Sequence, residues 1–232
     1  MSLDSLNPPN DSGVDLSLES SRGEIHCRYH RPAGTPHGAV LLVGGTDGGL
    51  DGPADSIYAA LAERLADDGI AGLRLDFRLH TAPGVLGEAI HDVFHGLDYL
   101  AKEGITRVGL VGHSFGGAVV IATALQRSEV AAVVTLSTQT AGVEGVQRLA
   151  PRPLLLVHGS ADDRLPPACS EYVYAMAREP KELVIFKGAR HSLRQCRGEL
   201  LELLAQWLLR ELMRQPSVQC SGPQHRLQPR DR

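Results

Sequence analysis

The pentapeptide Gly112-His-Ser-Phe-Gly116 places a serine between two glycines. The β-branched run RVGLV (107–111) precedes it and a segment of helical length follows it, so Ser114 is expected at a strand-to-helix junction. A turn this tight requires small neighbours, and it holds the hydroxyl above the carboxyl edge of a sheet. Ser114 is therefore predicted to be a nucleophile. The alternative is a glycine-rich helix start that performs no chemistry.

A serine hydroxyl is a weak nucleophile, so it needs a base for its proton and an acid that orients the base. The ends of two later strands offer both. The run PLLLVH (153–158) is followed by Asp162 and Asp163, and the run ELVIF (182–186) is followed by His191. The spacing from the strand favours Asp162 as the acid and leaves Asp163 as the alternative. Serine, aspartate and histidine then follow one another in the order of a known triad lineage.

An oxyanion hole needs two N–H groups near the nucleophile. We expect the first from Phe115, directly after the serine, and the second from the glycine-rich loop VGGTDGGLDG. Thr46, Gly45 and Asp47 are the candidates in this loop for the second donor. The loop lacks the G-x-G-x-x-G spacing of a dinucleotide site, so no cofactor is predicted.

The sequence also contains histidines and cysteines, which bind metals in many proteins, but their spacing does not form a complete set of metal ligands. His91 and His95 share one helical face, which can hold zinc, but the sequence supplies no third ligand. We therefore expect no metal site there. His113 and His158 flank the predicted site and are expected to pack or form hydrogen bonds. The four cysteines lie far apart without a CxxC pair, which indicates neither a disulfide framework nor a zinc site: Cys27, Cys169, Cys196 and Cys220.

Short apolar runs alternate with segments of helical length, which predicts βαβ units and a doubly wound, mostly parallel α/β sheet. The expected strands are 39–43, 70–77, 107–111, 130–136, 153–158 and 182–186. The expected helices are 53–69, 85–104, 115–127, 166–179 and 197–214. Ahead of them, two runs flank a polar turn and predict an antiparallel hairpin at the border of the sheet: 14–20 and 24–32.

The 232-residue chain is long enough for one domain, predicted over 14–214, between a flexible N-terminus (1–13) and a disordered tail (215–232). A net charge of -4 and 4% aromatic residues give no support to nucleic-acid binding. No apolar run approaches the roughly 20 residues of a membrane span, and the N-terminus lacks the apolar stretch of a secretory signal. These features predict a cytoplasmic protein with no membrane partner and leave its oligomeric state open.

Together the motifs resemble the α/β-hydrolase superfamily over roughly residues 15–212. The family pattern H-G-x-x-D after the seventh strand matches 158–162, and G-x-x-H after the eighth matches 188–191. The runs LRLDFR and RVGLVGHSFGG are similar to those of small lidless dienelactone hydrolases and serine esterases. Dienelactone hydrolases usually carry a cysteine nucleophile, so Ser114 favours an esterase. The family more often has histidine where this chain has Gly44, and alignment with that pattern implies Thr46 as the second oxyanion donor, with Gly45 and Asp47 as alternatives.

The resemblance implies a serine hydrolase that cleaves small carboxylic esters through an acyl-enzyme. The link from Ser137 to Arg152 is too short for a cap domain, so a lidless enzyme is predicted. Its partner would be a small-molecule ester or thioester. The alternatives are an acyl-CoA thioesterase, an amide-directed hydrolase and a non-catalytic scaffold of the same fold.

Overall fold

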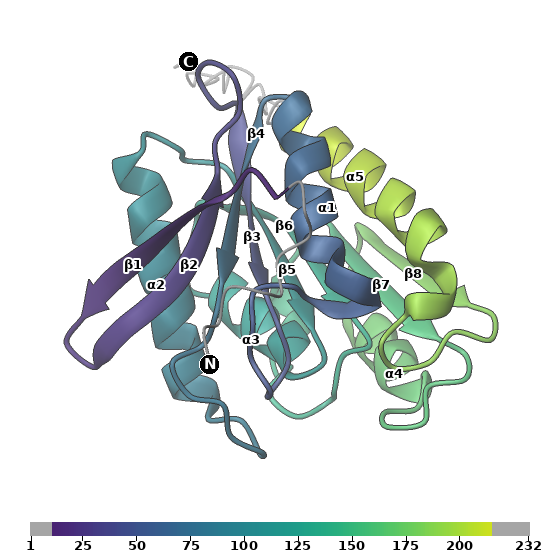
Figure 1. Ribbon diagram of the computed structural model, residues 1–232. Helices are drawn as coiled ribbons and strands as arrows, with labels where there is room; N and C mark the ends of the chain where they lie inside the picture. The colour runs from purple at the N-terminus through teal and green to yellow at the C-terminus, as the bar shows by residue number, and fades with distance from the viewer. Residues whose placement is uncertain (1–10, 215–232) are drawn as a thin grey trace, which may run out of the picture.

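Eight strands form one mixed sheet in the order β1-β2-β4-β3-β5-β6-β7-β8 (Figure 1). The computed structural model describes residues 11–214, so residues 1–10 of the predicted flexible N-terminus and the predicted tail 215–232 lie outside the described residues. The strands are β1 (Val14–Ser20), β2 (Gly23–His30), β3 (Gly38–Val43), β4 (Ile70–Leu75), β5 (Val108–His113), β6 (Val130–Leu136), β7 (Leu154–Gly159) and β8 (Lys181–Phe186).

The pairing confirms the predicted sheet and its N-terminal hairpin. Strands β1 and β2 pair antiparallel, and β2 joins the rest of the sheet through an antiparallel pairing with β4. All the remaining neighbours pair parallel. Strands β3 and β4 are buried along their whole length, which explains why their sequences are almost continuously apolar.

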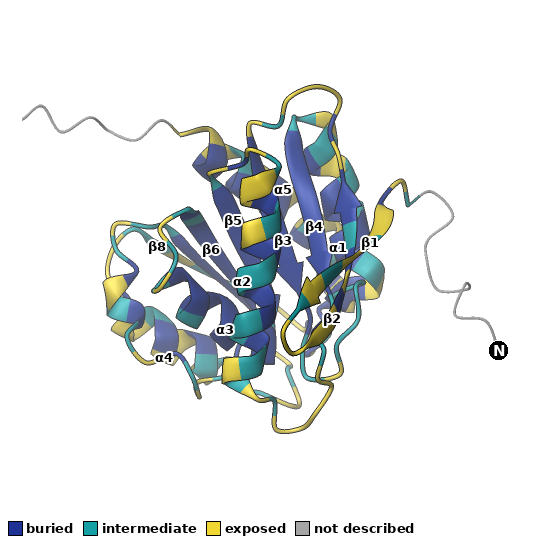
Figure 2. Cartoon of the chain, turned by 90° about the vertical axis from the view of Figure 1, so that its left-hand side faces the viewer, coloured by how far each residue is buried: buried dark blue, intermediate teal, exposed yellow. Residues whose placement is uncertain are grey.

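Helices cover both faces of the sheet, as a doubly wound fold requires. They are α1 (Pro53–Asp67), α2 (Leu86–Lys102), α3 (Phe115–Ala124), α4 (Ala168–Met176) and α5 (Arg197–Met213). Side chains of α1 and α5 pack in the core on one face, and side chains of α2, α3 and α4 pack in the core on the other. Figure 2 shows the central strands as buried, whereas much of the β1–β2 hairpin is exposed.

The predicted strands and helices are all present, with ends that differ by a few residues. The largest consequence is at β5, which runs two residues beyond the predicted end and reaches His113, directly before Ser114. Within the β6–β7 link, the described helical structure is one short 3-10 turn, Val146–Arg148. The fold therefore has no lid, as predicted. No described helix has both the length and the apolar character needed to cross a bilayer.

Candidate active site

Ser114 lies at the sharp turn between β5 and α3, with φ 56 and ψ -116. Its N–H donates to the carbonyl of Leu136, 2.8 Å away, which ties the turn to the neighbouring strand β6. A Cβ at Gly112 would lie 2.1 Å from the Gly116 oxygen, and a Cβ at Gly116 would lie 2.3 Å from the Gly44 oxygen. Only glycine fits either position. A serine held at positive φ is strained, and such strain is concentrated at functional sites.

His191 and Asp162 are brought together beyond the ends of β8 and β7. The Nδ1 atom of His191 lies 2.8 Å from Oδ2 of Asp162. The other carboxylate oxygen accepts the N–H groups of Arg164 and Leu165, each at 2.9 Å. Burial raises the pKa of Asp162, but these backbone hydrogen bonds and the contact with His191 outweigh it and hold the pKa below its ordinary value. Asp162 is therefore an ionised acceptor for the imidazole.

Asp163, the alternative acid, lies elsewhere. Its side chain is 64% exposed, and its carboxylate is 4.0 Å from the guanidinium of Arg190. His158 lies on the buried side of Asp162, with Nε2 3.1 Å from Oδ2. The other ring nitrogen of His158 lies 2.7 Å from the hydroxyl of Ser170. His158 is thus a hydrogen-bonding residue beneath the site, consistent with its sequence-based interpretation.

Ser114 and His191 line one cleft of about 450 Å³. Within the described part of the chain, no direct hydrogen bond joins the Ser114 hydroxyl to the His191 ring. Such contacts are often long in unliganded hydrolases. The described residues that line the cleft include no leucine, isoleucine, valine, methionine or phenylalanine. Its walls are polar side chains, small residues and backbone, mostly from the segment 44–56.

The candidate oxyanion donors lie beside this cleft. Phe115 is the first residue of α3, and N–H groups in the first turn of a helix have no intrahelical acceptor. Thr46 and both alternatives, Gly45 and Asp47, line the cleft. The loop passes close to the nucleophile at Gly45, where a Cβ would lie 3.5 Å from Cβ of Ser114.

Two charged residues that the sequence analysis did not single out hold the loop 44–52 in place. Asp76 accepts the N–H of Gly49 at 2.6 Å. Arg74 donates to the carbonyl of Leu50 at 2.8 Å and to the carboxylate of Asp51 at 3.1 Å. The signal was present in the sequence as two charges within the apolar run IAGLRLDF (70–77), where a buried strand normally has none.

The start of α1 differs from the regular helix predicted from Pro53. Ala54, Asp55 and Ser56 all have left-handed backbone conformations, with φ between 52 and 63. Two contacts with the loop that carries His191 hold this turn. The Ala54 N–H donates to the Ser192 carbonyl at 2.7 Å, and Arg194 pairs with Asp55 at 2.8 Å. These long-range contacts override the local preference for a right-handed turn.

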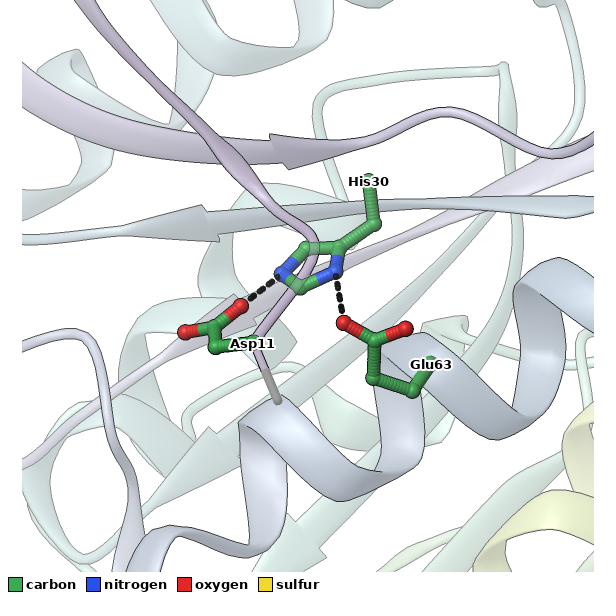
Figure 3. A group of neighbouring side chains, drawn as sticks. All are labelled: Asp11, His30 and Glu63. Carbon is green, nitrogen blue, oxygen red and sulfur yellow. Dashed lines mark ion pairs between the residues drawn. The ribbon is translucent and has the colours of Figure 1, made fainter. Parts of the chain in front are cut away.

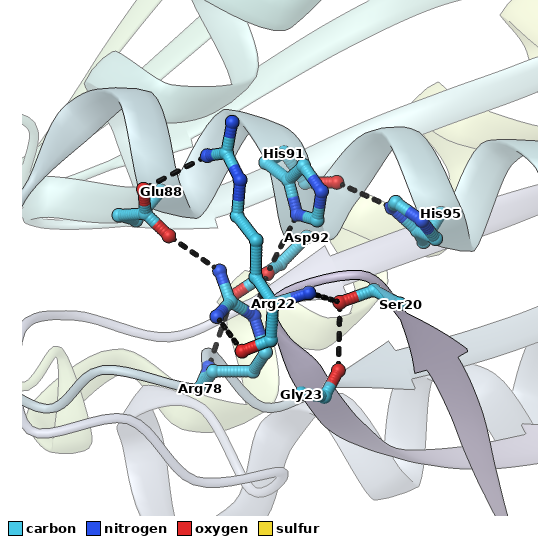
Figure 4. Close-up of polar contacts among 8 residues, drawn as sticks. All are labelled: Ser20, Arg22, Gly23, Arg78, Glu88, His91, Asp92 and His95. Atoms are coloured by element: carbon cyan, nitrogen blue, oxygen red, sulfur yellow. Dashed lines mark hydrogen bonds and ion pairs between the residues drawn. The ribbon is translucent and has the colours of Figure 1, made fainter.

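The loop between β4 and α2 is fixed by a second ion network (Figure 4). Arg78 donates to buried Asp92 at 2.6 Å and to Glu88 at 2.7 Å. His91 and His95 border this network, with ring centroids 4.4 Å apart and ring planes tilted by 40°. Among the described residues, neither histidine belongs to a group of three potential metal ligands. The zinc alternative therefore gains no support from the structure.

His113, directly before the nucleophile, packs against His191. The ring centroids are 4.9 Å apart, and Nε2 of His113 lies 3.0 Å from the His191 carbonyl. Burial is the main cause that lowers the pKa of His113 to about 4, and the positive charge of protonated His191 lowers it further. At neutral pH His113 is therefore uncharged, and its Nε2–H donates to the backbone carbonyl of His191.

This shift predicts a pH-dependent stability. The unfolded chain binds a proton at His113 with a pKa of about 6.5, above the folded value. The contribution of uncharged His113 to the free energy of unfolding is therefore fully present above that pH and is lost as the pH falls towards 4. Replacing His113 with glutamine should make the fall in unfolding free energy between pH 7 and 4.5 shallower, as measured by urea denaturation. The control is His26→Gln, which replaces an exposed histidine. If the unfolding free energy falls equally steeply in both variants, the lowered pKa of His113 is contradicted.

No protein-family model matches the chain. Two bacterial relatives, both of uncharacterized function, are similar in sequence. YfhR of Escherichia coli is 32% identical over 108 residues, covering 37% of this chain and 38% of that protein. Rv2307c of Mycobacterium tuberculosis is 28% identical over 211 residues, covering 78% of this chain and 73% of that protein. The matched region thus spans 38% of the length of YfhR.

Solved structures identify the fold. Est1E of Butyrivibrio proteoclasticus superposes with a TM-score of 0.74 at 19% identity, covering 88% of this chain and 100% of that chain. A dienelactone hydrolase of Anabaena variabilis gives 0.72 at 21% identity, with 86% and 97% covered. XC6422 of Xanthomonas campestris, a serine hydrolase without a lid, gives 0.70 at 19% identity, with 90% and 100% covered. The chain has the lidless α/β-hydrolase fold and is similar to small esterases and dienelactone hydrolase-like proteins.

Proposed function

We propose that this α/β-hydrolase-fold protein is a serine hydrolase that cleaves small carboxylic esters. The observation that carries the proposal is the hydrogen bond between Asp162 and His191 at the edge of the cleft that Ser114 also lines. Est1E, which shares the fold, has been solved with ferulic acid bound. That ligand is a small carboxylic acid and is consistent with an acyl group of modest size here.

In the proposed mechanism, Oγ of Ser114 attacks the acyl carbon while Nε2 of His191 takes the hydroxyl proton. The carbonyl π electrons move to the oxygen and form a tetrahedral oxyanion, which the N–H of Phe115 and one N–H of the loop 44–52 stabilise. We assign the second donor to Thr46. Collapse of this intermediate expels the alcohol, which leaves with the proton from His191. A water molecule then repeats the sequence on the acyl-enzyme and releases the acid and Ser114.

Asp162 would act by holding the imidazole. With Nδ1–H donated to the carboxylate, Nε2 is the unprotonated nitrogen and is free to accept the serine proton. The carboxylate also stabilises the imidazolium that forms during each half-reaction. Because Asp162 already accepts two backbone N–H groups, its position does not depend on His191 alone.

The test is a substrate panel on one sample: p-nitrophenyl esters, acyl-CoAs and anilides. Ester cleavage with the highest kcat/KM supports the proposal. A preference for acyl-CoAs or anilides would instead identify the thioesterase or the amide-directed hydrolase. Turnover of no substrate, together with no labelling by a fluorophosphonate, would indicate the non-catalytic scaffold.

The polar cleft predicts a preference for short acyl chains. A methylene that leaves water for an apolar wall gains about 0.8 kcal/mol, or roughly fourfold in kcat/KM. The described lining offers no large aliphatic side chain, so later methylenes gain little. Across C2 to C16 p-nitrophenyl esters, kcat/KM should therefore level off after a few carbons. A steady rise to C12 or beyond would show that an apolar surface covers the acyl group.

A further inference from the structure

Arg74 is the charged residue of β4, a strand whose other members are apolar or glycine, and its side chain is fully buried. Burying a guanidinium is unfavourable unless its charge and its donors are matched. Through Nε and Nη2, Arg74 reaches the loop 44–52 at the Leu50 carbonyl and the Asp51 carboxylate. Through Nη1 it donates to Asp11 at 2.5 Å. Arg74 thus connects the active-site loop to the segment that precedes β1.

Hydrogen bonds fix the segment 11–13 next to Arg74 and α1. The side chain of Asp11 is 1% exposed, and it also accepts the Gly13 N–H at 3.1 Å. Ser12 donates its N–H and its hydroxyl to the two oxygens of Glu63 on α1, at 2.6 and 2.8 Å. Burial raises the pKa of Asp11, but Arg74, the Gly13 N–H and Arg28 outweigh it and hold the pKa below its ordinary value.

His30 lies between the carboxylates of Asp11 and Glu63, as Figure 3 shows. A histidine with two carboxylates is a donor set that metal ions use, and these ligand atoms lie within 4.8 Å of one another. However, Arg74 lies 3.4 Å from His30, and Arg28 lies 3.3 Å from Asp11. The two guanidiniums already supply the positive charge, so we assign this group to ion pairing and not to metal binding.

We infer that Asp11 is a positioning residue for the loop 44–52, acting through Arg74. The inference rests on the proposed function, because that loop is where the second oxyanion donor is assigned. Asp51, the other carboxylate on Arg74, has a side chain that is 37% exposed, so Asp11 is the buried counter-charge. Without Asp11, the buried guanidinium loses the partner that fixes its position, and the loop hydrogen-bonded to Arg74 loses its fixed anchor.

The first test compares Asp11→Asn with Asp15→Asn. Asp15 lies four residues away and pairs with Arg28, but its side chain is 74% exposed and does not contact Arg74. We expect Asp11→Asn to lower kcat on p-nitrophenyl acetate by about tenfold with little change in KM, because misplaced donors weaken transition-state binding. Asp15→Asn should retain the parent kcat. If Asp11→Asn lowers Tm but leaves kcat unchanged well below Tm, the role is purely structural and the inference is wrong.

A second readout does not require activity. Amide hydrogen exchange in peptides covering 44–52 should be faster in Asp11→Asn than in the parent and Asp15→Asn, because the anchored amides open more often. Equal exchange in all three proteins would overturn the inference. If the parent hydrolyses no ester, the proposed function fails, and hydrogen exchange still decides whether Asp11 positions the loop.

A third variant covers the case in which Asp11→Asn does not fold. Glu63→Gln weakens the attachment of Ser12 without removing a charge that contacts Arg74, and the Glu63 side chain is 34% exposed. It should give the same two changes, in kcat and in exchange of 44–52, at smaller size. Parent values for both quantities in a folded Glu63→Gln protein would contradict the inference.

Discussion

Replacing Ser114 with alanine is expected to lower kcat by about 10³-fold or more while the protein remains folded. In the proposed mechanism neither His191 nor Asp162 can replace the attacking hydroxyl, because the three groups act as one unit. Alanine keeps the Cβ, so the turn between β5 and α3 should survive. Its anchor to β6 is the backbone N–H of residue 114, which the substitution leaves in place.

The measurement pairs steady-state kinetics with covalent labelling. A fluorophosphonate probe should modify the parent at Ser114 and fail to modify the alanine variant, as read by peptide mass spectrometry. The matched control is Ser128→Ala, because Ser128 is exposed in the turn that precedes β6, at the opposite edge of the sheet. Labelling at another serine, or parent-like kcat in Ser114→Ala, would contradict the mechanism.

The sequence predicted those parts of the molecule that depend on local pattern. The apolar runs placed the strands, and the glycines around Ser114 placed the turn, because only glycine tolerates the approaches that the structure shows at Gly112 and Gly116. The positions after β7 and β8 also predicted that the loops of Asp162 and His191 lie together, and these side chains are 2.8 Å apart. Loops that follow parallel strands lie at one edge of the sheet, so residues far apart in the chain can be assigned to one site.

Other features depend on partners that no local pattern identifies. Arg74 was visible as a charge within an apolar strand, but its partner Asp11 comes from a segment predicted to be flexible. The left-handed start of α1 follows from its contacts with Ser192 and Arg194, which are more than 130 residues away along the chain. The polarity of the cleft could not be predicted from local pattern either, because it depends on how the segment 44–56 is arranged in three dimensions.

The segment 44–56 connects the two halves of the proposed chemistry. At one end, the loop 44–52 is held by Arg74 and Asp76 beside the expected oxyanion position. At the other end, the N–H of Ala54 donates a hydrogen bond to the carbonyl of Ser192, the residue directly after the proposed base. A shift of this segment would therefore disturb both the base and an oxyanion donor, which is why its anchors are expected to affect kcat.

Asp162→Asn is expected to lower kcat by about 10³-fold or more, whereas Asp163→Asn should stay within about twofold of the parent. The hydrogen bonds at residue 162 give the reason. Two backbone N–H groups, from Arg164 and Leu165, point at Oδ1 and require an acceptor there. An asparagine satisfies them only with its amide oxygen, which turns its NH2 group towards Nδ1 of His191.

An NH2 group facing Nδ1 makes that nitrogen the acceptor and places the imidazole proton on Nε2. In this tautomer the basic lone pair of His191 is on Nδ1, so Nε2 cannot take the proton of Ser114. Asp163→Asn makes no such change, because the Asp163 side chain is exposed and its nearest ionic partner is Arg190 at 4.0 Å. Measuring kcat and Tm for both variants decides the assignment. A large loss of kcat in Asp163→Asn with a parent-like Asp162→Asn would transfer the orienting role to Asp163.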